Sequence, residues 1–422
     1  MATRVGGHAA GGRQPDRPAT SPGGFVVAPS TAGALAGLRV VELGFAAAGP
    51  WVGKHLANHG AEVIKVESRV APDPFRTTYP PFKDNVEGLD RAGMFAFFND
   101  GKRSITLDIK SPRGMELLRR LIRSSDVLLE SFPAGTMARR GLSYEALVAD
   151  KPDLVMLSSC NQGQTGPHAS HPGYGSQLTA LAGFLHLLGE SDRTPVLIYG
   201  PYIDYIAVGY GVIAILAALA RRRRTGRGCY IDLSQLEAGA QFMTPALLEY
   251  QSTGRVPARA GNRDVAAVPH GVYPAAGTDT WVALSVWSDD EWARFTRAAG
   301  HPEWSRADSA LDERIAEWTR GRSRETTVAA LRAEGLRASP VLTMSELFSD
   351  PQLRHREAWV EITHPVIGTL HGMAAPWRLS ATPQHLDHGG PPIGSDNEYV
   401  YRGLLGLSDD EMRELESEGT FR

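Results

Sequence analysis

The sequence predicts an α/β fold with a mostly parallel sheet, together with a second, smaller α+β domain. Between about residues 38 and 158, short apolar segments of strand length alternate with stretches of helical length. That alternation is typical of parallel sheets, whose neighbouring strands are connected by helices. From Val272 onward the pattern changes to short alternating strands followed by helices, which indicates a separate α+β unit.

The first strand–helix–strand unit surrounds a loop of small residues. Leu-Arg-Val-Val-Glu at 38–42 is typical of a buried strand, a helix is expected at about 51–58, and a second strand at 61–67. The loop between Gly44 and Pro50 lacks the GxGxxG spacing of dinucleotide-binding loops. It therefore indicates close backbone packing rather than NAD binding.

The remaining strands and helices follow in the same way. The further elements that the pattern predicts are a helix at about 112–124, strands at 126–130, 154–158 and 229–233, a helix at about 234–251, a strand at 281–287, helices at about 290–299 and 325–334, strands at 359–363 and 369–373, and an acidic helix at 409–418. We expect the late elements to pack back on the first domain, which makes the small domain an insertion.

Three kinds of segment follow from these patterns. Residues 1–34 are rich in Gly, Ala, Pro and Arg, lack the apolar core of a secretion signal, and are predicted to be a disordered tail. Residues 35–225 and 335–422 are predicted to form the large domain. Residues 226–334 are predicted to form a linker and the small α+β domain.

Composition and charge exclude several classes of protein. Of 422 residues, 42% are hydrophobic and 22% are charged, and the net charge of −3 comes from interspersed acids and bases, so no nucleic-acid partner is expected. Cys160 and Cys229 are too few for a disulfide framework or a cysteine zinc site, and no HExxH motif occurs. We therefore expect a reduced, cytoplasmic protein without a metal.

A long apolar run raises the question of a membrane span. Residues 205–220 carry no charge and are followed by four arginines at 221–224. The run is too short to span a bilayer and is interrupted by Gly209 and Gly211. We therefore predict a buried core helix, no membrane partner, and arginines at the helix C-terminus, where cations are favoured.

Asp204 is the single charge between Pro195 and Ala220. A carboxylate in apolar surroundings is either a satisfied structural acceptor or a group that a reaction uses. Gly200 and Pro201 just before it favour a turn that leads into a helix, where a short side chain can face a cleft. Both interpretations stay open on these residues alone.

Several motifs along the chain resemble one family. From about Leu38 to the C-terminus the sequence is similar to the family III CoA-transferases, the CaiB/BaiF group. The segments that carry the resemblance are Gly-Ala-Glu-Val-Ile-Lys-Val-Glu at 60–67, Asn-Asp-Gly-Lys-Arg-Ser-Ile-Thr-Leu-Asp at 99–108, Glu-Ser-Phe-Pro-Ala-Gly at 130–135, Gly-Gln-Thr-Gly-Pro at 163–167 and Thr-Gly-Arg-Gly-Cys-Tyr-Ile-Asp at 225–232.

The resemblance implies a fold and a reaction. It implies an interlocked homodimer in which each chain has a Rossmann-like, CoA-binding large domain, built from both ends of the chain, and a smaller middle domain. It also implies that CoA moves from an acyl-CoA donor to a free carboxylic acid acceptor through aspartyl-anhydride and aspartyl-CoA intermediates on Asp204. Gly261 matches a glycine-bearing loop that covers the site in related enzymes, where backbone N–H groups are expected to stabilise oxyanions.

The same resemblance implies residues for coenzyme A. Leu107 and Phe132 would offer apolar walls for the adenine, whereas Lys110 and Arg139 would supply cations for phosphates. Arg103 fits either a phosphate contact or a structural role. For any single Lys or Arg, a solvated side chain is the plainer interpretation.

Two departures from the family pattern concern the acyl pocket. Glycine stands at Gly175, where many transferases carry a carboxylate, and Tyr174 stands where related racemases have a His, which disfavours racemisation because Tyr is a poor base near neutral pH. Ala47 lies in an alanine run where formyl-CoA transferases have a Gln. We therefore expect a wider, less polar acyl pocket than one for formate or oxalate, with Tyr174, Tyr202 and Tyr205 as walls.

Two other functions remain open for this fold. One is an acyl-CoA isomerase or α-methylacyl-CoA epimerase, and the other is a non-catalytic member that binds CoA esters. A nucleophilic pair formed by Cys160 with His168 or His171 is disfavoured, because a thiol at the end of a buried strand usually behaves as a small hydrophobe.

Overall fold

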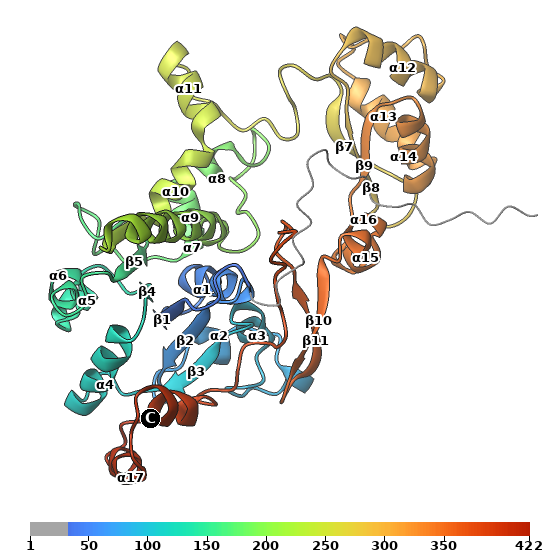
Figure 1. Ribbon diagram of the computed structural model, residues 1–422. Coiled ribbons are helices and arrows are strands. Elements are labelled where there is room, and N and C mark those ends of the chain that lie inside the picture. Colours follow the sequence, from blue (N-terminus) through green and yellow to red (C-terminus); the bar gives the residue numbers. More distant parts are fainter. Residues whose placement is uncertain (1–32) are drawn as a thin grey trace, which may run out of the picture.

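The computed structural model describes residues 33–422, so that residues 1–32 of the predicted tail lie outside the described residues. Its largest element is a six-stranded sheet with the strand order β3-β2-β1-β4-β5-β6, in which every neighbouring pair is parallel (Figure 1). The strands are β1 (Arg39–Leu43), β2 (Glu62–Glu67), β3 (Arg103–Thr106), β4 (Val127–Glu130), β5 (Val155–Cys160) and β6 (Cys229–Ser234). The α/β fold with a parallel, Rossmann-like sheet is thereby confirmed.

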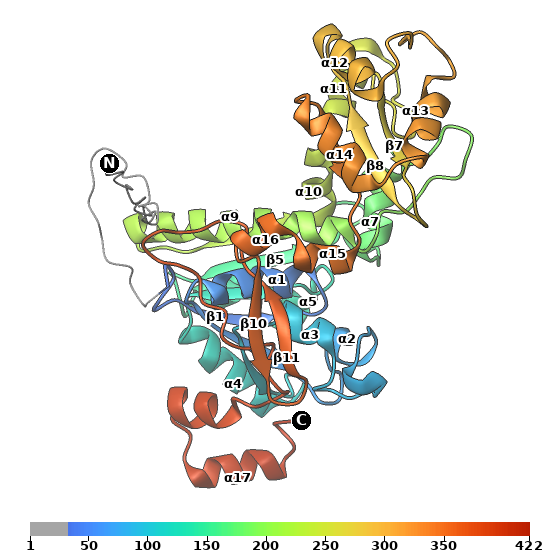
Figure 2. The same ribbon diagram turned by 90° about the vertical axis from the view of Figure 1, so that its right-hand side faces the viewer.

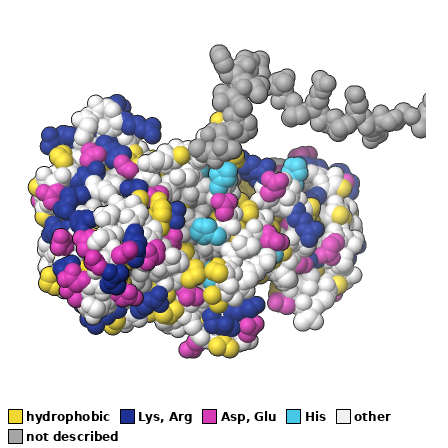
Figure 3. Space-filling view, turned by 60° about the horizontal axis from the view of Figure 1, so that its bottom comes forward, with side chains coloured by type: hydrophobic (Ala, Val, Ile, Leu, Met, Phe, Trp, Pro, Cys, Tyr) yellow, Lys and Arg dark blue, Asp and Glu magenta, His cyan; other side chains and the backbone are white. Residues whose placement is uncertain are grey.

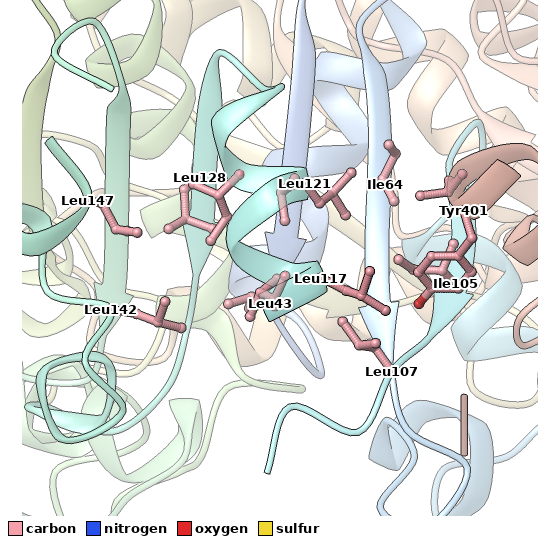
Figure 4. Close-up of a cluster of buried hydrophobic side chains, with 14 of the residues drawn as sticks. Leu43, Ile64, Ile105, Leu107, Leu117, Leu121, Leu128, Leu142, Leu147 and Tyr401 are labelled. Carbon is pink, nitrogen blue, oxygen red and sulfur yellow. The ribbon is translucent and has the colours of Figure 1, made fainter. Parts of the chain in front are cut away.

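Helices cover both faces of this sheet, so its central strands are buried on both sides. Successive residues such as Val40 and Val41 point to opposite faces, as the twofold period of a strand requires. Val41 packs with α4 and α17, and part of this cluster is drawn in Figure 4. Val40 packs with α1 and α9 on the other face. The helices of this part of the chain are α1 (Ala48–Asn58), α2 (Pro74–Thr77), α3 (Gly93–Phe98), α4 (Pro112–Arg123), α5 (Thr136–Arg139), α6 (Tyr144–Val148), α7 (Gly175–Leu181), α8 (Phe184–Leu187) and α9 (Tyr202–Thr225), with a 3-10 turn at Lys83–Asn85.

The middle of the chain forms a smaller unit around an antiparallel sheet of order β7-β8-β9 (Figure 2). Its own apolar core, which includes Phe295, Ile315 and Leu331, lies between the sheet and its helices. The elements from β6 to β9 are α10 (Gln235–Phe242), α11 (Thr244–Thr253), β7 (His270–Pro274), β8 (Trp281–Ser285), α12 (Asp289–Ala299), α13 (Leu311–Arg320), α14 (Arg324–Ala333) and β9 (Arg337–Pro340). The sequence boundaries of the two domains stay a prediction.

The C-terminal part packs back on the large sheet. Tyr401, Met412 and Leu415 belong to the core cluster beneath β1 and β2, so residues from the two ends of the chain share one core. The late elements are α15 (Met344–Ser349), α16 (Pro351–His355), β10 (Trp359–His364), β11 (Gly368–Met373), a π-helical turn at Tyr399–Leu404 and α17 (Asp409–Ser417). On the face shown in Figure 3, Lys and Arg side chains are interspersed with Asp and Glu, without a stripe of one sign.

Two predicted helices differ from the structure. The helix expected at 234–251 is two helices, α10 and α11, because Pro245 has no N–H for the helical hydrogen bond and favours a helix start. The helix expected at 205–220 is the longer α9, and it is buried along one face only. Its opposite face exposes Tyr210, Ile213 and Leu216.

Helix α9 is long and apolar enough to cross a membrane by length and composition. Its packing is that of a core helix, however, because Ile215 and Leu219 belong to the sheet's core cluster. At Gly211 an added Cβ would lie 2.9 Å from Val52 Cγ2, so glycine allows α9 to approach α1 closely. The arginines end the helix as expected, and Arg222 pairs with Asp126 at 2.9 Å.

A network of buried charges lies beneath the loop between β1 and α1. Lys102 Nζ contacts Glu42 Oε2 at 2.8 Å and donates to Pro50 O at 2.6 Å. Lys65 Nζ contacts Asp73 Oδ2 at 3.1 Å and donates to Gly44 O at 2.6 Å. Acids and bases are matched in number, with Glu42, Glu67, Asp73 and Asp100 facing Lys54, Lys65, Arg76 and Lys102. The matching matters because an unpaired buried charge costs several kcal/mol.

Candidate functional site

A cleft of about 570 Å³ opens beyond the carboxyl ends of β1 to β4. Between β1 and β4 the order of the strands reverses, and open α/β sheets bind their ligands in the crevice at such a switch point. Three of the residues predicted for coenzyme A line this cleft, namely Leu107, Lys110 and Phe132. The structure therefore brings together residues from two of the quoted motifs, those at 99–108 and 130–135.

The turn after β4 forms one wall of the cleft and is held by its own polar groups. Phe132 N donates to Glu130 Oε2 at 2.7 Å, and Phe45 N donates to Ser131 Oγ at 3.1 Å. The rings of Phe45 and Phe132 then lie 6.1 Å apart, and both line the cleft. Burial raises the pKa of Glu130 to about 7. This carboxyl was missed at the sequence level, although its place at the end of an apolar strand was visible.

The two predicted arginines lie outside the cleft. Arg103, at the start of β3, pairs with Glu62 and with Asp396 at 2.9 Å, at the strand end opposite to the cleft. Arg139 bonds to Thr136 Oγ1 within its own helix, whereas its neighbour Arg140 lines the cleft. Sequence alone could not separate two adjacent arginines, because which of them faces the cleft depends on how α5 packs.

Gln164, from the motif at 163–167, connects this turn to the far edge of the sheet. Gln164 Oε1 accepts a hydrogen bond from Gly135 N at 3.0 Å, and Gln164 N donates to Asp232 Oδ1 at 3.0 Å. The motifs at 130–135, 163–167 and 225–232 thus meet in one hydrogen-bonded chain. These bonds hold the turn that carries Phe132.

The loop between β1 and α1 separates the cleft from the start of α9. Gly44 and Phe45 line the cleft, while Ala46 has a left-handed φ of 58° and donates from its backbone N to Asp73 at 3.2 Å. A non-glycine residue in this conformation is strained and needs its surroundings to hold it. The bonds from Asp73 and Lys65 supply that constraint.

On the other side of this loop lies an aromatic cluster that includes Tyr205. Ala47 is buried in this cluster with Phe98 and Phe75. Trp51 stacks edge-on against Tyr205, with ring centroids 5.0 Å apart. The alanine that replaces a glutamine is therefore surrounded by aromatic rings, so this wall is apolar, but the rings fill the space around Ala47 where a wider pocket was expected.

Asp204 lies in the first turn of α9, directly before Tyr205. Within residues 33–422 its half-buried carboxylate forms no hydrogen bond or ion pair. Burial raises the pKa of Asp204 to about 7. A carboxylate that folding leaves without a partner matches the chemical interpretation better than that of a satisfied structural acceptor.

Gly175 explains why no second carboxylate stands beside Asp204. A Cβ at Gly175 would lie 2.5 Å from Asp204 Oδ1 and 2.5 Å from Pro201 Cβ. Any side chain at this position would therefore displace the carboxylate. The departure from the family pattern at Gly175 leaves the backbone of α7 in contact with Asp204.

The remaining predicted site residues are distributed around α9. Tyr202 packs on Phe184, whereas Tyr174 is 70% exposed. Gly261 has a φ of 60°, and its N–H donates to Gly189 O at 2.9 Å. To serve as an oxyanion donor, this N–H would have to leave Gly189. The structure thus places Gly261 against the segment that leads into α9, and its catalytic role stays a prediction.

Among residues 33–422, no group of three or more His, Cys, Asp or Glu side chains could hold a metal ion. His55 on α1 and His59 at its C-cap have the HxxxH spacing that occurs in metal-binding pairs. However, His59 Nδ1 bonds to His55 O at 2.8 Å and its Nε2 accepts from Trp377 Nε1 at 3.0 Å, so both nitrogens are occupied. Burial also raises the pKa of Cys160 to about 12, which keeps the thiol protonated.

Comparisons with known proteins agree with this arrangement. The chain is 32% identical to the succinyl-CoA–D-citramalate CoA-transferase of Chloroflexus aurantiacus, over 90% of this chain and 96% of the relative. It is also 32% identical to the succinate–glutarate CoA-transferase of Agrobacterium fabrum, over 88% of this chain and 95% of the relative. The crystal structure of a CaiB/BaiF family protein from Brucella suis superposes with a TM-score of 0.81 at 33% identity, covering 88% of this chain and all of the other.

The family model for CoA-transferase family III matches residues 35–397. This match spans the six-stranded sheet, the smaller unit that follows it, and the strands β10 and β11. It confirms the resemblance that the five motifs indicated. The chain belongs to CoA-transferase family III and is an enzyme of the CoA-transferase class.

Proposed function

We propose that the enzyme moves CoA from an acyl-CoA thioester to a free carboxylic acid through covalent intermediates on Asp204. The observation that carries this proposal is the carboxylate itself, which is half-buried, has no partner within residues 33–422, and lies on α9, the helix that packs against α1. Gly44 and Phe45 of that loop line the cleft, and its Ala47 shares an aromatic cluster with Tyr205. A thioester reaching past the loop would meet Asp204.

The reaction exchanges acyl bonds without a net change in oxidation state. Asp204 attacks the thioester carbonyl, the C–S bond breaks, and an aspartyl–acyl anhydride and CoA thiolate form. The thiolate then attacks the aspartyl carbonyl, which releases the donor acid and leaves aspartyl-CoA. The acceptor carboxylate repeats the two steps in reverse order and leaves with CoA, which restores Asp204.

Burial prepares Asp204 for this role. A poorly solvated carboxylate is a stronger nucleophile than one in water, and the apolar rings beside it keep water from hydrolysing the anhydride. Each attack creates an oxyanion that needs a hydrogen-bond donor. The loop around Gly261 is the donor source that we propose, after its bond to Gly189 opens.

Replacement of Asp204 tests the covalent mechanism. We expect Asp204→Asn to abolish transfer without lowering the thermal midpoint, because the change removes a buried charge and keeps the shape of the side chain. Incubation of the wild type with acyl-CoA and hydroxylamine should leave a hydroxamate on Asp204, detected by intact-protein and peptide mass spectrometry. Since only the ionised carboxylate attacks and its pKa is raised to about 7, about half of it is ionised at pH 7, and kcat/KM should fall by about 50-fold from pH 7 to pH 5.

Other results would favour the alternatives. Transfer at the wild-type rate by Asp204→Asn would refute the mechanism. Exchange of an α-proton of the acyl group in deuterated water, without an adduct on Asp204, would favour an epimerase. The absence of both the adduct and the exchange would favour a non-catalytic protein that binds CoA esters.

Gly175 offers a second test of the same carboxylate. The methyl group of Gly175→Ala would lie 2.5 Å from Asp204 Oδ1, and a displacement of about 1 Å at a nucleophile can cost about 100-fold in rate. We expect kcat to fall by that order, measured by the formation of the product CoA ester. Gly209→Ala on α9 is the matched control, because no atom lies within 4 Å of the added group. Equal rates in the two variants would contradict the placement.

The apolar wall around Ala47 predicts the preferred acids. Formate and oxalate are small and strongly polar, so the aromatic cluster with Phe98 and Tyr205 should serve them poorly. We expect faster transfer to succinate, glutarate and larger acids, measured with one acyl-CoA donor across a series of acceptor acids. The highest kcat/KM with oxalate would contradict this expectation.

We also propose that the enzyme acts as a homodimer. The outer face of α9 and the helices α10 and α11 expose Ile213, Phe242, Leu247 and Leu248, and exposed apolar patches of this kind usually mark an interface. Sedimentation should give twice the chain mass of 45.6 kDa. Leu247→Glu combined with Leu248→Glu should shift the protein to single chains. A wild type that sediments as one chain at all concentrations would contradict the dimer.

A further inference from the structure

The last residues of the chain are fixed beside the cleft. Asp108 N donates to Thr420 O at 2.8 Å, and Thr106 Oγ1 donates to Phe421 O at 2.8 Å. The ring of Phe421 stacks on Tyr401, with centroids 4.4 Å apart. The C-terminal segment therefore extends the end of β3 and lies against the large sheet, next to α17 (Figure 1).

This contact brings Arg422 to the rim of the cleft. Arg422 lines the cleft together with Lys110 and Arg140, which come from two other segments of the chain. Its guanidinium lies 3.3 Å from Asp108 Oδ2, at a side-chain exposure of 63%. Asp108 Oδ1 accepts a hydrogen bond from Lys110 N at 2.9 Å. The carboxylate of Asp108 thus contacts the main chain of Lys110 and the side chain of Arg422.

Two of these cations have no protein partner. Within residues 33–422, neither Lys110 nor Arg140 forms an ion pair or a side-chain hydrogen bond. The other charged residues that line the cleft are paired, Lys65 with Asp73, Glu67 with Arg76 and Arg422 with Asp108. Lys110 and Arg140 therefore add positive charge that a bound anion would offset. Phosphate groups are such anions, and arginine binds them with paired N–H donors.

We propose that Arg422 is a phosphate-binding residue, and that with Lys110 and Arg140 it holds the nucleotide end of the CoA ester. This inference rests on the proposed function, because it takes the cleft to be the CoA cleft. Leu107 and Phe132 form apolar walls between the cations, which suits an adenine ring. The pantetheine arm then leads along Gly44 towards Asp204.

Asp108 lines the cleft and contacts two of these cationic residues. Its lone pairs are directed at Lys110 N and the Arg422 guanidinium, so it is a positioning residue. The contact with Arg422 is long and exposed, which leaves the guanidinium free to turn towards a phosphate. Asp108 thereby keeps Arg422 at the rim without neutralising it by a tight pair.

Calorimetric titration of the full-length protein with coenzyme A tests the proposal. We expect Arg422→Ala to weaken binding by about tenfold, since a charge-assisted hydrogen bond to phosphate is lost. Arg422→Lys, which keeps the charge, should bind with intermediate affinity. Arg413→Ala on α17 is the matched control, because Arg413 pairs with Asp410 and does not line the cleft, and it should bind as the wild type does.

A parallel titration with dephospho-coenzyme A identifies the phosphate involved. If Arg422 binds the 3′-phosphate, the wild type and Arg422→Ala will bind this ligand equally. If Arg422 binds the pyrophosphate, the loss of affinity will persist. Equal affinities of the wild type and Arg422→Ala for both ligands would overturn the proposal.

The same titrations separate this inference from the proposed function. Coenzyme A affinity that depends on Arg422, with no adduct on Asp204, would refute the transfer mechanism and retain the phosphate site. An adduct on Asp204, together with coenzyme A affinity that does not depend on Arg422, would support the transfer mechanism and refute the phosphate site. A wild type that does not bind coenzyme A would refute both.

Discussion

Two buried lysines, Lys102 and Lys65, meet the carboxylate of Glu42 beneath the β1–α1 loop, and the geometry around the cleft depends on this contact. Lys102 also donates to Pro50 O and Lys65 to Gly44 O, so both ends of the loop are fixed from below. Loss of one partner would leave a buried charge unpaired, at a cost of about 3–5 kcal/mol. The loop can hold its strained conformation because these buried lysines fix the carbonyl groups of Gly44 and Pro50.

The constraint reaches the chemistry through packing. One side of the loop is a wall of the cleft, and its other side touches the rings around Tyr205, next to Asp204. A shift of the loop would therefore move the cleft wall and Asp204 relative to each other. This makes the buried network part of the site, and its members Lys65, Glu67 and Asp73 themselves line the cleft.

Much of the fold could be predicted from the sequence because buried parallel strands are continuous apolar runs. β1, β2, β4, β5 and β6 were predicted in this way, and Asp204 stood out as a lone charge in such surroundings. β3 was missed because Arg-Ser-Ile-Thr has only one strongly apolar residue. The exposed face of α9 was missed as well, since a run that is apolar all round does not reveal which side the chain itself covers.

The residues around the cleft show a second limit. Leu107, Lys110 and Phe132 were found through local motifs, whereas Arg422 meets Asp108 across a separation of 314 residues. No local pattern reports such a contact, because it arises only when the C-terminal segment docks on β3. The difference between Arg139 and Arg140 depends in the same way on tertiary packing.

The contact between Gly175 and Asp204 has a consequence for how the enzyme can diversify. Because Gly175 has no side chain, α7 offers no side chain beside Asp204 that could distinguish one acid from another. Selectivity for the acid then has to come from other side chains, such as the tyrosines around α9. Selectivity for the acid can therefore change while Asp204 and its contact with Gly175 stay as they are.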